Sequence, residues 1–289
     1  MMHRFGCVHP APLGPDPAKN PLFPTIAQSR RQLRDLADKM NTRLPPVLLT
    51  SCVIVADHTV TLKDRDTRIR LTVESIGKWL AMSPYLPLVI CDGSNFDFSG
   101  IVREEFPQAR IESLYFQNDT QMVGIHGKGY GEGEIVNYAI AHSAYLKESD
   151  YFAKCTAKLW VENFFDCLAG WNGTCLLKGY FADVFSFKPT QFDYIDTRFY
   201  LVSKPFYTQY LASTYLDVGG ENGLSLEHCF RNVILDNGFH KVLFNVPPVV
   251  CGVGGGIGTY YKNNLKRRIK ESIRLRLVKR NKSFHSLFE

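Results

Sequence analysis

The sequence predicts an α/β protein with a mostly parallel, Rossmann-like sheet and helices on both of its faces. Apolar, β-branched runs of strand length recur along the first half of the chain, and helical stretches separate them over about 110 residues. The chain has 289 residues, of which 45% are hydrophobic, so it can bury one large core. We therefore expect one main domain with short appendages.

The first strand is predicted within "PPVLLTSCVIV" (45–55), a continuous apolar run typical of a strand covered on both faces. In the next segment, "RIRLTVESIGKWLAM", the apolar residues recur at helical spacing. Two further strands are expected in "LPLVICDGSN" and "ARIESLYF", followed by a helical stretch near 132–146 and a strand at 151–158. This alternation is typical of βαβ units.

The second half of the chain is expected to cover the site that the first half forms. Short strands are predicted near 174–178, 183–188 and 241–245, and helices near 204–216 and 221–236. The predicted organisation has four parts. These are a disordered leader (1–24), a nucleotide-binding half (46–165) and an acceptor-side half (166–261) of one catalytic domain (25–261), and a basic tail (262–289).

Cysteine spacing and charge narrow the class of protein. The eight cysteines include no CxxC pair, and several lie in apolar runs, which indicates buried, reduced thiols in a cytosolic protein rather than a zinc site. The formal charge of +6 comes from the tail: residues 262–289 carry ten Lys or Arg against two Glu, which leaves a net −2 for the rest. No apolar run is long enough to span a bilayer.

The predicted strand "YFAKCTAKLW" (151–160) carries two lysines and no carboxylate. Side chains alternate between the faces of a strand, so Lys154, Thr156 and Lys158 share one face, while the small residues between them share the other. An unpaired ammonium in a core is costly. The lysines therefore need solvent, a carboxylate or an anionic ligand.

Two loops at predicted strand or helix ends have the composition of ligand sites. Asp92 and Gly93 in "VICDGSNFD" follow a buried strand, where they fit either contact with a nucleotide or a turn that ends the strand. "GIHGKGYGEGEIVNYAI" (124–140) has five glycines in ten positions before a helix and includes Lys128. A glycine-rich loop at a helix N-terminus presents backbone N–H groups to phosphate.

The order of these segments resembles that of GT-A-fold glycosyltransferases, in particular bacterial enzymes that assemble surface polysaccharide or lipopolysaccharide. The resemblance covers roughly residues 46–165. It implies a nucleotide-sugar donor bound by the "CDGSN" turn, by the helix that carries Asn137, and by the strand that normally ends in a metal-binding DxD motif. In this chain Lys154, Thr156 and Lys158 stand there instead.

Because hard divalent cations need oxygen ligands, no bound metal and no other cofactor is expected. Instead, the two lysines are predicted to neutralise the donor diphosphate. The alternative is that they extend to solvent or pair with Asp150 or Glu162.

In the resembled enzymes an acidic residue at a helix start often deprotonates the acceptor. Glu227 in "GENGLSLEHCFRNVI" is our candidate for this base, with Glu221 and Asp217 as competitors and simple helix capping as the structural alternative. The second glycine-rich loop, "PPVVCGVGGGIGTYYK", corresponds to a segment that often folds over the donor. Thr259, Tyr260 and Lys262 are therefore candidate lid residues, with an ordinary linker as the alternative.

The tail places Leu265, Ile269, Ile273 and Leu277 at every fourth position among basic residues. This pattern predicts a basic amphipathic helix on an anionic membrane surface, hence a cytoplasmic protein peripheral to the inner face of the membrane. No nucleic-acid partner is expected, because aromatics are not interleaved with the basic residues.

The predicted function is transfer of a sugar from a nucleotide-sugar to a cell-surface glycan or lipid-linked acceptor. The alternatives are a catalytically inactive, glycan-binding relative of the same fold and a sugar nucleotidyltransferase. The segment after the first strand, "TSCVIVADH", lacks the glycine-rich, basic signature of the latter.

Overall fold

The computed structural model describes residues 44–57, 60–219, 223–256 and 258–289. The predicted leader and the first residues of the predicted catalytic domain lie outside these ranges.

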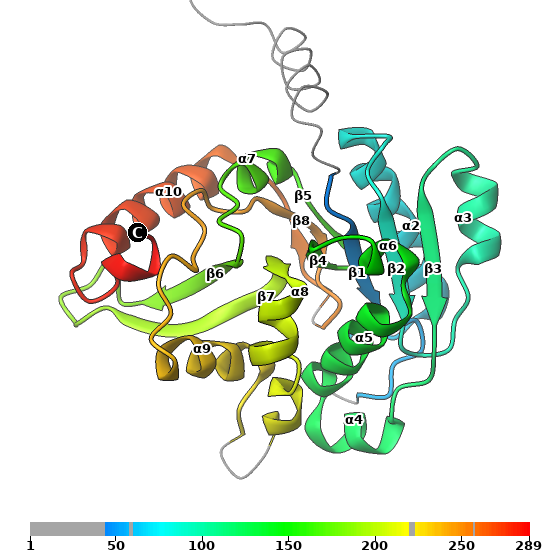
Figure 1. Cartoon of the computed structure of the whole chain (residues 1–289), viewed down its shortest axis with the longest axis horizontal. Helices are drawn as coiled ribbons and strands as arrows, with labels where there is room; N and C mark the ends of the chain where they lie inside the picture. The colour runs from blue at the N-terminus through cyan, green and yellow to red at the C-terminus, as the bar shows by residue number, and fades with distance from the viewer. Residues whose placement is uncertain (1–43, 58–59, 220–222, 257) are drawn as a thin grey trace, which may run out of the picture. The chain divides into compact units, whose positions relative to one another are not determined.

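A six-stranded sheet with the order β3-β2-β1-β4-β7-β6 forms the centre of the fold (Figure 1). Its strands are β1 (Val47–Ser51), β2 (Leu88–Asp92), β3 (Ile111–Tyr115), β4 (Tyr151–Thr156), β6 (Cys175–Ala182) and β7 (Gln191–Ser203). The first four in sequence are mutually parallel, and β7 is antiparallel to both of its neighbours. The predicted α/β class with a mostly parallel sheet is confirmed.

Helices cover both faces of this sheet, as predicted. They are α2 (Arg65–Met82), α3 (Ser99–Glu105), α4 (Thr120–His126), α5 (Lys128–His142), α6 (Ala144–Lys147), α7 (Phe164–Ala169), α8 (Lys204–Phe206), α9 (Leu226–Asp236) and α10 (Leu265–Arg280), with short helical turns η2 (Tyr207–Leu211), η3 (Thr214–Asp217) and η4 (His285–Leu287). Side chains of α5 and α9 pack in one apolar cluster, and those of α2, α3 and α7 pack in a second cluster on the opposite face.

The lysine strand β4 separates these clusters as its alternation predicts. Phe152 belongs to the cluster with α5, whereas Ala153, Cys155 and Ala157 belong to the cluster with α2. Seven cysteines fall within the described residues; all are free thiols and six are buried. The face that carries Lys154 and Thr156 is therefore the face that α5 covers.

A smaller three-stranded sheet follows β4 directly. Its order is β5-β8-β9, made of β5 (Leu159–Val161), β8 (Val250–Val253) and β9 (Tyr260–Tyr261). The second glycine-rich loop connects β8 to β9, so this sheet brings the loop next to the end of β4.

The carboxyl-terminal segment packs onto the same body. Val278 of α10, together with Leu287 and Phe288, is buried in the cluster that contains β6. Among the described helices, none combines the length and the apolar character that crossing a bilayer requires.

Two strands predicted for the second half were wrong. Residues 183–188 form turns and bends, and residues 241–245 contribute only an isolated bridge between Leu177 and Leu243. The helix predicted over 204–216 is divided into α8, η2 and η3. The long strand β7 was not predicted, because polar residues in "QFDYIDTRFYLVS" interrupt its alternation.

That interruption is a bulge. Leu176 of β6 pairs with Leu201 of β7, and Lys178 pairs with Asp196. Between these two pairs the chain advances two residues in β6 and five residues in β7, so β7 contains the extra residues. Bulges re-aim side chains locally. This one directs Thr197 towards the end of β4 and the start of α9.

Candidate active site

The carboxyl ends of β1, β2 and β4 meet at one edge of the sheet. β2 and β4 lie on opposite sides of β1 and are both parallel to it. In doubly wound sheets the crevice where the winding reverses is the usual ligand site. Several of the predicted donor-binding residues, among them Asp92, Gly93, Thr156 and Lys158, lie at or just beyond these strand ends.

The turn after β2 is held by its own aspartate. Asp92 is fully buried. Its Oδ1 accepts hydrogen bonds from the backbone N–H of Ser94 at 2.8 Å and from the Ser94 hydroxyl at 2.6 Å. Its Oδ2 accepts a hydrogen bond from the backbone N–H of Val53 at 3.0 Å. These bonds favour the structural alternative for Asp92, a turn that joins the ends of β1 and β2. Contact of Asp92 with a nucleotide remains a prediction.

Gly93 allows this turn to contact the first glycine-rich segment. A Cβ built on Gly93 would lie 2.6 Å from side-chain atoms of Asn118, and one built on Gly131 would lie 2.7 Å from the same side chain. Asn118, which the sequence analysis did not single out, therefore fills the space between the turn and α5. Both glycines are needed for this close approach.

Lys154 has a carboxylate partner. Its side chain is fully buried, and Nζ donates to Oε1 of Glu132 at 2.5 Å and to the carbonyl oxygen of Thr197 at 2.8 Å. Thr156 Oγ1 lies 3.5 Å from the same ammonium. The partner is on α5, and neither Asp150 nor Glu162, the two carboxylates considered from the sequence, pairs with it. Glu132 lies within the quoted glycine-rich motif, so its position was visible but its role was missed.

Lys158 has a different environment. It lies beyond the end of β4 with 3% exposure, and within the described residues no hydrogen-bond or ion-pair partner is found for its Nζ. Burial lowers the pKa of Lys158 to about 7, and the charge of Arg68 acts in the same direction. Lys154 is thus paired with a carboxylate, whereas Lys158 is buried without an ion-pair partner in the described residues.

Arg68 is the second cation at this position, and the sequence analysis missed it. Its guanidinium is buried, with Nε donating to the carbonyl of Cys52 at 2.7 Å and Nη1 to that of Leu62 at 2.8 Å. A Cβ built on Gly255 would lie 3.4 Å from Nζ of Lys158 and 3.9 Å from Nη2 of Arg68. Both cations therefore lie directly beneath the second glycine-rich loop.

The second glycine-rich loop is fixed against neighbouring segments. Gly256 accepts a backbone hydrogen bond from Thr61 at 2.7 Å, and Gly254 donates to the carbonyl of Thr259 at 2.9 Å. The ammonium of Lys128, at the start of α5, lies 2.9 Å from where a Cβ of Gly256 would be. Thr259 and Tyr260 are exposed beside it. The structure brings Lys128, Lys158 and this loop together, and lid movement remains a prediction.

Asn137 lies apart from this group. Its Nδ2 donates to the carbonyl of Ala212 at 2.8 Å and so joins α5 to the segment after η2. This bond gives Asn137 a structural role, and its contact with a donor remains a prediction.

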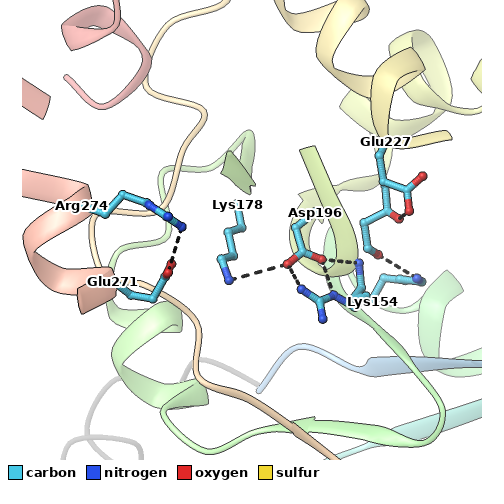
Figure 2. Close-up of polar contacts among 8 residues, drawn as sticks. Lys154, Lys178, Asp196, Glu227, Glu271 and Arg274 are labelled. Atoms are coloured by element: carbon cyan, nitrogen blue, oxygen red, sulfur yellow. Dashed lines mark hydrogen bonds and ion pairs between the residues drawn. The ribbon is translucent and has the colours of Figure 1, made fainter. Parts of the chain in front are cut away.

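Glu227 lies in the first turn of α9 and is partly exposed. Its Oε1 accepts from the hydroxyl of Thr197 at 3.4 Å, and Figure 2 shows it on the same side of Asp196 as Lys154. Thr197 thus contacts both residues, through its hydroxyl and its carbonyl. Of the competing bases, Asp217 is exposed at the end of η3, and Glu221 lies outside the described residues.

A second ionic cluster supports the strand that carries Thr197. Asp196 is buried and accepts from Arg198 Nε at 2.7 Å and Nη2 at 2.5 Å, with Lys178 Nζ at 3.6 Å (Figure 2). Burial opposes its ionisation, but the Arg198 hydrogen bonds and the Lys178 charge hold the pKa of Asp196 well below its usual range. Arg198 also lies over the ring of Tyr261 at 4.7 Å, which ties β7 to β9.

The side chains nearest Gly255 and Gly256 of the second glycine-rich loop are cationic: Lys158, Arg68 and Lys128. No three His, Cys, Asp or Glu side chains among residues 44–57, 60–219, 223–256 and 258–289 form a group suited to a metal ion. Where a DxD motif would supply carboxylates, the chain supplies Thr156 and Lys158, and Arg68 adds a further positive charge. These residues do not fit Mg²⁺ or Mn²⁺, because hard cations take oxygen ligands and like charges repel.

No protein-family model and no curated protein matches the chain. Among solved structures, the chain is similar to the inositol-1-phosphate CTP transferase from T. maritima at 13% identity, with a TM-score of 0.44 and coverage of 83% of this chain and 98% of that one. A 4-diphosphocytidyl-2C-methyl-D-erythritol synthase matches at 12% identity and a TM-score of 0.37, covering 80% and 99%. The bifunctional glycosyltransferase WbbM matches at 8% identity and a TM-score of 0.38, covering 79% and 40%. At these values the likenesses do not assign an activity to the chain.

Proposed function

We propose that this protein is a glycosyltransferase that moves a sugar from a nucleotide-sugar to a hydroxyl of a cell-surface glycan or lipid-linked glycan. The observation that supports this most directly is the buried pair Arg68 and Lys158 beneath the glycine-rich loop at the end of β4. Buried cations without a counter-charge are costly to a fold, and functional sites are where such costs are found.

Neither cation forms an ion pair in the described residues, although Asp92 attracts both at longer range, and the diphosphate of a nucleotide-sugar has the charge to pair with them directly. At 4 Å and an effective dielectric constant of 20, each cation–phosphate pair contributes on the order of 4 kcal/mol of attraction before desolvation is subtracted. Lys128 reaches the same loop and adds a third cation at the rim. In this proposal fixed side-chain charges take the role that a divalent metal has at a DxD motif.

Glu227 has a suitable position for the acceptor side. The acceptor hydroxyl oxygen forms a bond to the anomeric carbon of the sugar, the bond from that carbon to the phosphate oxygen breaks, and the hydroxyl proton passes to the Glu227 carboxylate. The leaving phosphate keeps the electron pair, and Arg68 and Lys158 stabilise its charge. Lys154 is a positioning residue here, because its ammonium is already bound by Glu132 and Thr197.

The experiment that tests this proposal follows products. Purified protein is incubated with UDP-, GDP-, dTDP- and CMP-sugars and glycan acceptors, with EDTA and with Mn²⁺ in parallel. Release of the nucleotide together with a glycosylated acceptor, equally in EDTA, is the expected result.

Other outcomes overturn the proposal in distinct ways. Pyrophosphate release from a nucleoside triphosphate and a sugar phosphate would show nucleotidyl transfer. Donor binding without turnover of any donor would identify a non-catalytic relative. Strict dependence on Mn²⁺ would contradict the role of Arg68 and Lys158.

A further inference from the structure

The helix α10 is held to the domain by one side only. Val278 is 1% exposed in the core, and Arg274 pairs with Glu271 at 3.0 Å while its guanidinium lies over the ring of Tyr180 at 5.4 Å. The Arg274–Glu271 pair lies within the helix, whereas the burial of Val278 and the contact of Arg274 with Tyr180 fix the rotation of α10 about its axis. Its opposite side is therefore a defined outer face, which lies along the outside of the molecule in Figure 1.

The outer face carries an aliphatic stripe. Leu265, Ile269, Ile273 and Leu277 are 72%, 50%, 44% and 42% exposed. Their four-residue spacing places them on one side of the helix over about 18 Å, at 1.5 Å per residue. A contiguous apolar surface of this kind indicates an interaction site, whereas scattered exposed residues do not.

Positive charge surrounds the stripe. The exposed basic residues of α10 are Lys266, Arg268, Lys270, Arg276 and Arg280, and the one acid of the helix, Glu271, is held inward by Arg274. At its carboxyl end an open hollow of about 550 Å³ is lined by Arg276, Lys279, Arg280 and Lys282, beside the His285–Glu289 pair. The outer face of α10 therefore combines aliphatic side chains with cations, and the one acid at the hollow, Glu289, lies 3.2 Å from His285.

We infer that α10 is a docking surface for an anionic lipid bilayer, with the aliphatic stripe at the acyl boundary and the basic residues at the headgroup phosphates. Such a surface binds through apolar burial and electrostatic attraction together. A second copy of the chain would oppose like charges across the stripe, and a nucleic acid would leave the aliphatic residues without a partner. The inference does not depend on the proposed transferase activity.

The test measures binding of the full chain to vesicles of phosphatidylcholine, with and without phosphatidylglycerol. Wild type is expected to bind the anionic vesicles and to be released by salt. Ile269→Ser/Ile273→Ser and Lys266→Gln/Lys270→Gln are each expected to lower the partition coefficient by about tenfold or more. The matched controls change equivalent exposed residues elsewhere: Ile125→Ser on α4, and Arg103→Gln/Lys147→Gln on α3 and α6.

The controls are expected to bind as wild type does, and thermal denaturation checks that every variant folds. Equal binding by the α10 variants and wild type overturns the inference. So does loss in the lysine variant alone, since that result shows a purely electrostatic contact such as one with nucleic acid. Dimerisation that the Ile269→Ser/Ile273→Ser variant abolishes, without vesicle binding by wild type, shows that the stripe is a protein interface and also overturns it.

Discussion

Replacement of Lys158 by methionine separates the two roles that the structure gives this residue. Methionine has a similar length and no charge, so Lys158→Met removes a buried ammonium without opening a large cavity. In the described residues the ammonium has no hydrogen-bond or ion-pair partner, and the longer-range attraction of Asp92 and Glu132 does not offset its burial and the charge of Arg68, so the charge makes the free protein less stable. We expect the variant to unfold at a higher temperature than wild type and to bind nucleotide diphosphates more weakly.

The magnitude follows from the pKa. Burial, with the nearby charge of Arg68, lowers the pKa of Lys158 from 10.5 to about 7. Between these values the unfolded chain binds more protons than the folded protein, so the folded state loses stability as the pH falls. At 1.36 kcal/mol per pKa unit, the full penalty below pH 7 is on the order of 5 kcal/mol, and it disappears as the pH rises to 10.5.

The assay is chemical denaturation of wild type and Lys158→Met across this pH range. Their stabilities should converge at alkaline pH and diverge towards neutrality, with Lys158→Met the more stable. Calorimetric titration should show nucleoside diphosphate binding weakened by roughly ten- to 150-fold, the loss expected for one charge-assisted hydrogen bond. A pH-independent stability difference combined with unchanged affinity would refute the reasoning.

Two control variants make this result specific. Lys154→Met leaves Glu132 without its partner and should destabilise the protein by roughly 3 to 5 kcal/mol, as expected when one member of a buried pair is removed. Lys128→Met alters an exposed residue and should change stability little. Gains in stability from all three substitutions would show that the effect is not due to the buried charge of Lys158.

Three further predictions concern the same site. Donor binding near pH 8 should be accompanied by uptake of close to one proton, because the diphosphate restores the charge of Lys158, which is mostly neutral in the free protein. Calorimetric titration in buffers of different ionisation enthalpy measures the proton uptake, and binding without uptake would contradict the prediction. Glu227→Gln should lower kcat by a factor of roughly 10² to 10⁴ and leave donor affinity unchanged. Asp217→Asn should have the steady-state kinetics of wild type, and the reverse pattern would make Asp217 the base. Glu132→Gln should lower the free energy of unfolding, measured in urea, by roughly 3 to 5 kcal/mol, because it leaves Lys154 buried without a counter-charge. The control is Asp97→Asn, at the exposed start of α3. A smaller loss in Glu132→Gln than in this control would contradict the importance of the Lys154–Glu132 pair.

Local sequence patterns predicted the first half of the fold well. The strands β1 and β2 are short apolar runs whose burial on both faces leaves a clear pattern, and the order of the loops predicted which edge of the sheet would be polar. The strand β7 was missed because its bulge mixes buried Asp196 and Thr197 with aromatic residues. Alternation is lost at the place where the chain bends to reach the site.

The candidate site was predicted less completely. Lys158 and the glycine-rich loops have local signals, whereas Arg68 lies on α2 among ordinary helix residues, and nothing in the neighbouring sequence shows that its side chain turns back to Cys52. The Lys154–Glu132 contact joins a strand to a helix 22 residues away in sequence. Such pairings depend on how elements pack, and a residue's own neighbours do not specify them.

The different surroundings of the two lysines have an evolutionary consequence. Lys154 is constrained from inside the protein, so positions 154 and 132 are expected to change together among relatives, and an apolar pair could replace both without loss of the fold. Lys158 has no such partner in the described residues, and under the proposed function its retention depends on selection for the ligand. In a lineage that lost the activity, Lys158 would be expected to be replaced early by an uncharged residue, and the descendants would be more stable than their active ancestor.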